Sequence, residues 1–243
     1  MSGTSSASAF GSASDVVRYA LERASTLERL HWLEAAAPFL AYWLLCAIFT
    51  LRGLDTRPDV HYEKNSVSRL RVVASVASLH ATGVFTNVVY MLLVEHRGLE
   101  TLRWTHLVIG MLVLDAIEYW VHRAWHTSLL YERFHKEHHR LKAPYSYAAL
   151  YNGMGETSVT SPLVGLGFYA CGLSWREFLV VTTAAYLSTA HQHTYTGTGA
   201  HHWRHHALSS QHNFAQPFLP YWDYLMGTAY VARAEPRRTA STE

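Results

Sequence analysis

The chain has 243 residues, of which 16% are charged and 13% aromatic, and its formal net charge is +2. Soluble domains carry about 25% charged residues. The composition therefore favours a membrane protein or a heavily buried one, and the small net charge gives no indication of nucleic-acid binding. Histidine is the outlier, because the chain has 17 and 12 of them lie between His122 and His212.

The two ends of the chain differ from its middle. Residues 1–14 are small and polar, and residues 15–34 space apolar side chains among charges. This spacing predicts an amphipathic helix, either at a membrane surface or in an ordinary soluble arrangement. We expect three parts: an N-terminal tail with this helix at 1–34, a membrane domain at 35–230 and a polar C-terminal tail at 231–243.

Three apolar runs in the first half of the chain predict membrane-spanning helices. Residues 35–51 are uncharged and have the minimum length for a span, residues 72–94 are almost as apolar, and residues 105–121 form the third run. The third run carries Asp115 and Glu118. Because carboxylates are costly against lipid, we expect both to face the protein interior or water.

Two later runs, 157–175 and 177–191, predict a helical hairpin, because a short turn separates them. A hairpin brings the histidines after residue 190 back to the side of those before residue 140. Of the 20 lysines and arginines, 14 lie on that side, and this bias places it in the cytoplasm. The sequence thus predicts an all-α integral membrane bundle of about four transmembrane helices with a cytosolic, histidine-rich helical cap.

The histidines recur at the spacing of a helix face. His122 and His126 are four residues apart, and two further sets have the spacing i, i+3, i+4, which places their imidazoles on one side of a helix. These sets are His135, His138 and His139, and His202, His205 and His206. The pattern predicts that ligands dispersed over some 85 residues meet at one place.

So many imidazoles would repel one another and lose hydration unless a cation held them. Their number exceeds the four ligands of one zinc site, and the absence of thiolate argues against a structural zinc cage. The segment 135–139 also lacks the HExxH pattern of zinc peptidases. We expect two metal ions. Two irons with open positions are able to bind dioxygen and oxidise an unactivated C–H bond, although spacing alone does not select iron.

The order of motifs resembles the membrane fatty acid hydroxylase and sterol desaturase superfamily over roughly residues 105–230. The motifs are DAIEYWVHRAWH at 115–126, HKEHH at 135–139, HWRHH at 202–206, NF at 213–214 and WDYLMGT at 222–228. Within the superfamily, HHRLKAPYSYAALYN at 138–152 and NFAQPF at 213–218 are similar to segments of the sphinganine C4-hydroxylases.

The resemblance implies a non-haem centre of two iron ions in the endoplasmic reticulum membrane, with the histidines facing the cytosol. It also implies dioxygen as the oxidant and electrons from cytochrome b5 and its reductase as separate proteins. The subfamily implies hydroxylation of a lipid, a long-chain base or ceramide, at carbon 4. The metal ligands that it implies are His122, His126, His135, His138, His139, His193, His202, His205 and His206.

Four other residues are candidates for orienting these ligands: Asp115, His191, Asn213 and Asp223. Asp115 either holds an imidazole by a hydrogen bond or pairs with Arg123 or Lys136. Asn213 and Asp223 either do likewise or act as cap and turn residues. His191 either assists the site or forms a hydrogen bond nearby.

Three alternatives remain open at this point. The nearest is a sterol C5-desaturase or a sterol 4-methyl oxidase on the same scaffold. A histidine-rich metal transporter without redox chemistry is more distant, and it predicts polar residues along the membrane helices, which are sparse here. The third is a zinc-dependent lipid hydrolase.

Overall fold

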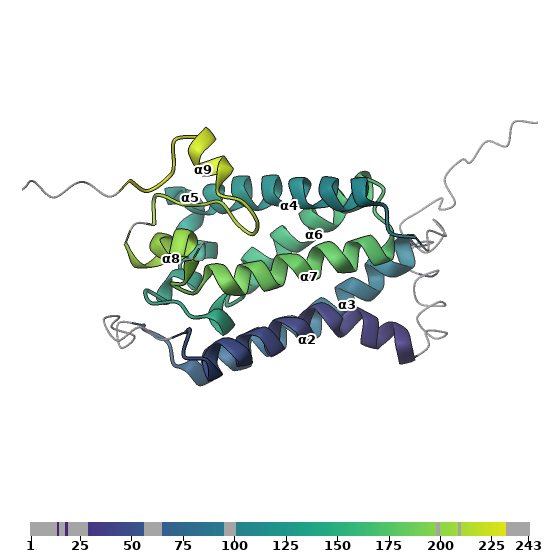
Figure 1. Cartoon of the computed structure of the whole chain (residues 1–243), viewed down its shortest axis with the longest axis horizontal. Coiled ribbons are helices and arrows are strands. Elements are labelled where there is room, and N and C mark those ends of the chain that lie inside the picture. Colours follow the sequence, from purple (N-terminus) through teal and green to yellow (C-terminus); the bar gives the residue numbers. More distant parts are fainter. Residues whose placement is uncertain are drawn as a thin grey trace, which may run out of the picture.

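The computed structural model describes residues 29–55, 65–94, 101–197, 200–208 and 210–231, together with Ser14 and Arg18. All regular elements in these residues are helices (Figure 1), so the predicted all-α class is confirmed. Most of the predicted amphipathic helix and of both tails lies outside the described residues. The boundaries of the three predicted parts therefore stay predictions.

Three long helices are apolar enough to cross a membrane. They are α2 (Arg29–Leu51), α3 (Arg69–Val94) and α4 (Trp104–Trp125), and they contain the three runs predicted for the first half of the chain. Each has the roughly 20 residues that a bilayer requires. Apolar side chains such as Leu44 on α2 and Val108 on α4 remain exposed, as expected of helices that contact lipid.

The predicted hairpin is present as α6 (Met154–Ala170) and α7 (Trp175–Gln192). Neither helix qualifies as a span by length and hydropathy. The reason is that α6 has only 17 residues, and α7 carries Arg176, Glu177 and several hydroxyl side chains. Among the described residues, length and hydropathy support three spans, and the fourth stays a prediction.

The turn of the hairpin is closed by a set of buried hydrogen bonds that we call the hairpin clamp (Arg103, Ser174 and Glu177). Ser174 and Glu177 form a capping box, in which each side chain accepts a hydrogen bond from the other residue's main-chain N–H. Arg103, at the start of α4, donates to both carboxylate oxygens of Glu177. The clamp joins the start of α4 to the start of α7.

The five long helices lie side by side along the longest axis of the molecule (Figure 1). The core between α3, α4, α6 and α7 includes Tyr90, Leu114, Phe168 and Val181. Because lipid tails are as apolar as these side chains, their close van der Waals packing holds the bundle together in a membrane. The packed bundle thereby supports the short helices at its end.

Short helices cover one end of the bundle, at the left in Figure 1. They are α5 (Ser128–Leu130), the π-helical turn η3 (Tyr131–His135), the 3-10 turns η4 (His138–Arg140) and η5 (Ser146–Ala148), α8 (Ala200–Ala207) and α9 (Tyr221–Leu225). This is the predicted histidine-rich helical cap. Its position in the cytosol stays a prediction.

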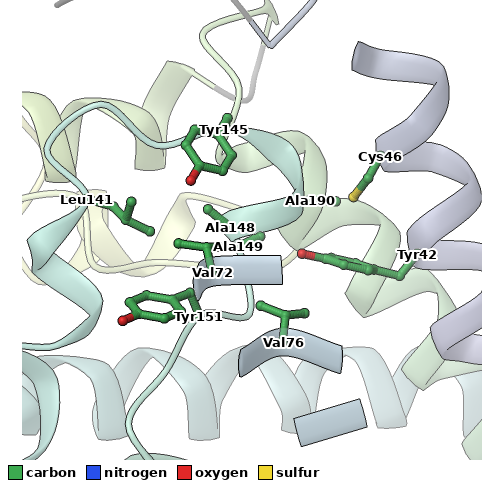
Figure 2. Close-up of a cluster of buried hydrophobic side chains, with 10 residues drawn as sticks. All are labelled: Tyr42, Cys46, Val72, Val76, Leu141, Tyr145, Ala148, Ala149, Tyr151 and Ala190. Carbon is green, nitrogen blue, oxygen red and sulfur yellow. The ribbon is translucent and has the colours of Figure 1, made fainter. Parts of the chain in front are cut away.

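The segment after His139 is held against the bundle by the cluster drawn in Figure 2. Leu141, Tyr145 and Tyr151 pack on Tyr42 of α2 and Val72 of α3, and all five are at most 2% exposed. Tyr42 also donates a hydrogen bond to the main-chain oxygen of Ser146 in this segment. The packing fixes the main chain on which two histidines of the cap depend, as described next.

Candidate metal centre

Nine histidines converge inside the cap in two adjoining groups. In each group, one donor atom per histidine lies within 4.8 Å of the corresponding atoms of all the others. The five-histidine group is His122, His126, His135, His139 and His205, and the four-histidine group is His138, His193, His202 and His206. These are the nine residues singled out from the sequence, and no other histidine of the described chain belongs to either group.

The two HxxHH motifs supply both groups in opposite ways. In the first motif, His135 and His139 join the five-histidine group and His138 joins the other. In the second motif, His202 and His206 join the four-histidine group and His205 joins the other. Residues i and i+4 lie on one face of a helical turn, and residue i+3 is offset around it. Each motif can therefore serve two neighbouring centres.

The cap keeps these imidazoles away from water and in their neutral form. All nine histidines are 8% exposed or less. Burial, followed by the proximity of the other imidazoles, lowers the pKa of His139, His202 and His206 well below its usual range. Burial lowers the pKa of His193 to about 4. Neutral imidazole is the form that binds metal, so the site is already in its ligating protonation state at neutral pH.

In seven of the nine histidines, the ring nitrogen that faces away from the group (Nδ1, the outer nitrogen) forms a hydrogen bond. In six of them, Nδ1 donates to a main-chain oxygen, at 2.7–3.3 Å. The pairs are His122 with Phe214, His138 with Tyr151, His193 with Thr189, His202 with Asn213, His205 with His212, and His206 with Leu141. Such bonds fix the tautomer and leave the Nε2 lone pair directed inward.

The Nε2 atoms, which face into the groups, cannot all form hydrogen bonds with one another. In the five-histidine group, Nε2 of His139 lies 3.1 Å from the Nε2 atoms of His126, His135 and His205. A neutral imidazole carries one N–H, so these four atoms cannot all be paired by hydrogen bonds. In the four-histidine group, Nε2 of His193, His202 and His206 has no partner in the described structure. Buried unpaired acceptors cost about 1–3 kcal/mol each, and a cation at each position removes that cost.

Asp223 and Asn213 position the segment that holds two of these histidines. Asp223 is fully buried and accepts hydrogen bonds from the main-chain N–H groups of Phe214 and Ala215. Asn213 takes a left-handed conformation, with φ of 59°, which Asn tolerates better than most residues. Its side chain bonds the main chain of His201 and Tyr230. Asn213 contacts the imidazole of His202 only through its main-chain oxygen. Among the described residues, the carboxylate of Asp223 bonds none of the nine grouped imidazoles, so it supports them through the main chain.

Asp115 and His191 lie beside the site and belong to neither histidine group. The Asp115 carboxylate accepts hydrogen bonds from the main-chain N–H groups of Phe218 and Leu219, and these take the place of the predicted imidazole, Arg123 or Lys136. Asp115 thereby ties α4 to the segment before α9. The ring of His191 lies 6.0 Å from that of Phe49, measured between centroids.

One contact was not predicted from the sequence. Glu156, in the first turn of α6, is 7% exposed and accepts a hydrogen bond of 3.1 Å from Nδ1 of His135. In the sequence, the only sign of this contact is that Glu156 is a single carboxylate at the start of the mainly apolar α6. The main-chain oxygens that hold the other six histidines leave no signal in the sequence, because every residue has one.

The family model described as Fatty acid hydroxylase matches residues 107–228, a stretch that contains all nine histidines. The chain belongs to the fatty acid hydroxylase family. It is therefore an enzyme of a family of hydroxylases and monooxygenases, and the resemblance drawn from the motifs is confirmed. No solved structure matches the chain.

Curated relatives with several different names are similar to this chain. Sphinganine C4-monooxygenase 1 of Arabidopsis thaliana is 30% identical, over 87% of this chain and 92% of its own length. Very-long-chain aldehyde decarbonylase GL1-9 of Oryza sativa subsp. indica is 28% identical, over 79% and 86%. Methylsterol monooxygenase 1-2 of Arabidopsis thaliana is 33% identical, but over only 50% and 46%. The likeness to the sterol oxidase is thus confined to about half of each chain.

Proposed function

We propose that this chain is a membrane monooxygenase that hydroxylates a sphingoid long-chain base or its ceramide, such as sphinganine or dihydroceramide, at carbon 4. The relative named sphinganine C4-monooxygenase supports this substrate, because the similarity covers 87% of this chain. The observation that carries the chemistry is the convergence of nine buried histidines in two adjoining groups.

We further propose that each group holds one iron ion. Iron is the metal that the resemblance implies, and an all-imidazole donor set suits it. When bound, the two ions supply the activation of dioxygen that attack on an unactivated C–H bond requires. The nine histidines are ligands in this proposal, with Asn213 and Asp223 positioning the main chain behind His122 and His202.

The protein's own part in the reaction is binding, orientation and exclusion of water. The Nδ1 contacts hold the ring planes before the metal arrives, so little reorganisation is needed at the moment of reaction. The buried cap keeps water from the site, which limits side reactions of a strong oxidant. No side chain is required as a nucleophile or a general base.

The partners follow from the resemblance. We propose dioxygen as the oxidant, cytochrome b5 and its reductase as the source of electrons, and the endoplasmic reticulum membrane as the location. The three apolar helices support a membrane location. The bias of basic residues toward the histidine side supports a cytosol-facing cap, where a separate electron-donor protein has access.

The experiment is expression in a host that lacks its own long-chain-base hydroxylase, followed by mass spectrometry of its lipids. We expect a new 4-hydroxylated base, absent when His138 is replaced by alanine. A new sterol double bond or an oxidised sterol methyl group without that product would assign the chain to sterol oxidation instead. Conversion of long-chain aldehydes alone would assign it to the chemistry named for the rice relative.

A further inference from the structure

Of the seven hydrogen bonds that hold outer ring nitrogens in the two groups, one differs in chemistry. The partner of His135 is the carboxylate of Glu156, whereas the other six partners are main-chain oxygens. Both side chains of this pair are at least nine-tenths buried, with 1% of His135 and 9% of Glu156 accessible. A carboxylate behind an imidazole raises its basicity, which a neutral carbonyl does far less.

The chain brings these two residues together by a close approach of α6 to η3. A Cβ added at Gly155 would lie 2.7 Å from the ring of Phe134, the residue before His135. A Cβ added at Gly153 would lie 3.1 Å from the main-chain oxygen of Phe134. The two glycines therefore allow the first turn of α6 to come near enough for Glu156 to reach the imidazole.

The surroundings of Glu156 favour a cation nearby. Glu118, one turn before His122 on α4, is close enough to Glu156 to interact with it electrostatically. No lysine or arginine among the described residues forms an ion pair with either carboxyl group. A positive ion at the five-histidine position favours the charged form of Glu156, whose carboxyl group reaches that ion through His135.

We propose that Glu156 is a positioning residue that orients His135 and strengthens metal binding at the five-histidine position alone. Among the described residues, no carboxylate bonds Nδ1 of the histidines at the four-histidine position, since these imidazoles bond main-chain oxygens. This inference rests on the proposed function, because it assumes that both positions bind a metal. It predicts that the two positions respond differently to a single change that removes one negative charge.

The test uses the full-length chain in detergent, loaded with Fe²⁺ without oxygen and titrated with a chelator while the bound iron per chain is measured. In Glu156→Gln, which keeps an acceptor but removes the charge, we expect one ion to leave at a chelator concentration about 10–100-fold lower than in the wild type. The other ion should leave at the wild-type concentration. Mössbauer spectra of ⁵⁷Fe should change in one component only.

Glu132→Gln is the matched control, because Glu132 lies on η3 three residues before His135 but pairs with the exposed Lys136. If Glu156→Gln fails to accumulate, Glu156→Asp replaces it: its carboxylate falls one methylene short of His135, and the same selective loss is expected. Wild-type release of both ions in the variant, or equal weakening of both, overturns the proposal. A wild-type chain that binds no iron refutes the proposed function instead.

Discussion

The two ends of the helical bundle differ in how far their buried polar groups are hydrogen-bonded. At the hairpin clamp, Glu177 is fully buried, and both its oxygens accept hydrogen bonds, from the side chain and main chain of Arg103 and from the main chain of Ser174. At the histidine end, Nδ1 of seven of the nine histidines is hydrogen-bonded, but in the described part of the chain Nε2 of His193, His202 and His206 has no partner. The clamp is complete in itself, and the histidine site is complete only with a ligand.

This difference separates a structural polar network from a functional one without reference to any relative. Both networks are buried, and both occupy the ends of helices. A structural network satisfies every group that it buries, because an unpaired buried group destabilises the fold. Where a fold leaves several acceptors of one kind unpaired and aimed at one point, the missing partner is a cation.

The largest effect is expected from removing a ligand. His138→Ala should abolish lipid oxidation and reduce the bound iron, because the four-histidine group then has only three imidazoles. The chain should remain in the membrane. Product analysis and metal content provide the measurement, with His106→Ala, at the clamp end of α4, as the control. Full activity in His138→Ala would contradict the ligand assignment.

Breaking the hairpin clamp should lower the free energy of unfolding but leave the metal site unchanged. Arg103→Ala leaves the Glu177 carboxylate buried without its cation, which should cost about 3 kcal/mol of unfolding free energy. The folded fraction should bind as much iron as the wild type. Denaturation in detergent and metal analysis check both parts. Loss of iron from folded Arg103→Ala would show that the two ends are not independent.

His193 at one end and Glu177 at the other should make the metal-free chain lose stability in different pH ranges. Burial lowers the pKa of His193 to about 4 from 6.5, so the unfolded chain takes up the proton first and stability falls as pH drops below 6.5. Burial raises the pKa of Glu177, but hydrogen bonds from Arg103 and Ser174 outweigh it and bring the pKa to about 2, below 4.5. That stability is present above pH 4.5 and is lost below it.

Thermal unfolding of the metal-free chain at several pH values measures these two losses separately. Glu177→Gln should reduce the loss below pH 4.5, to which Asp223 and Glu137 also contribute because their pKa values are lowered, and should retain the loss that begins at pH 6.5. Iron should oppose the upper loss, because bound metal excludes protons from the imidazoles. The same pH dependence in Glu177→Gln and wild type would contradict the assignment of the lower range to the clamp.

The smallest effect is expected from Tyr151→Phe. Tyr151 contributes its main-chain oxygen to His138 and its hydroxyl to Glu137. The substitution removes only the hydroxyl, so stability should fall by about 1 kcal/mol or less and the bound iron should stay unchanged. Lost iron in this variant would mean that the Tyr151 ring, rather than its main chain, supports the site.

The sequence predicted the helices and eight of the nine histidines because both depend on local spacing, whereas His193 came only from the family resemblance. Apolar runs of the right length predicted α2, α3 and α4, and histidines three or four residues apart predicted the other candidate ligands. The division of each HxxHH motif between two groups was not predicted, since it depends on how α8 packs against η3 and η4.

The contacts behind the ligands were the least predictable part. Asp115 was expected at an imidazole or a basic side chain, but it binds the main chain of Phe218 and Leu219. Glu156 was overlooked, although it reaches His135. A carboxylate has many partners of similar energy, and tertiary packing chooses among them, so residue type and spacing alone do not identify the partner.

The most direct test of the central claim is the iron content of the purified wild-type chain after anaerobic loading with Fe²⁺ and removal of loosely bound metal. The account predicts two irons per folded chain, one for each histidine group. A single ion per chain, or zinc retained in place of iron under the same conditions, would contradict it.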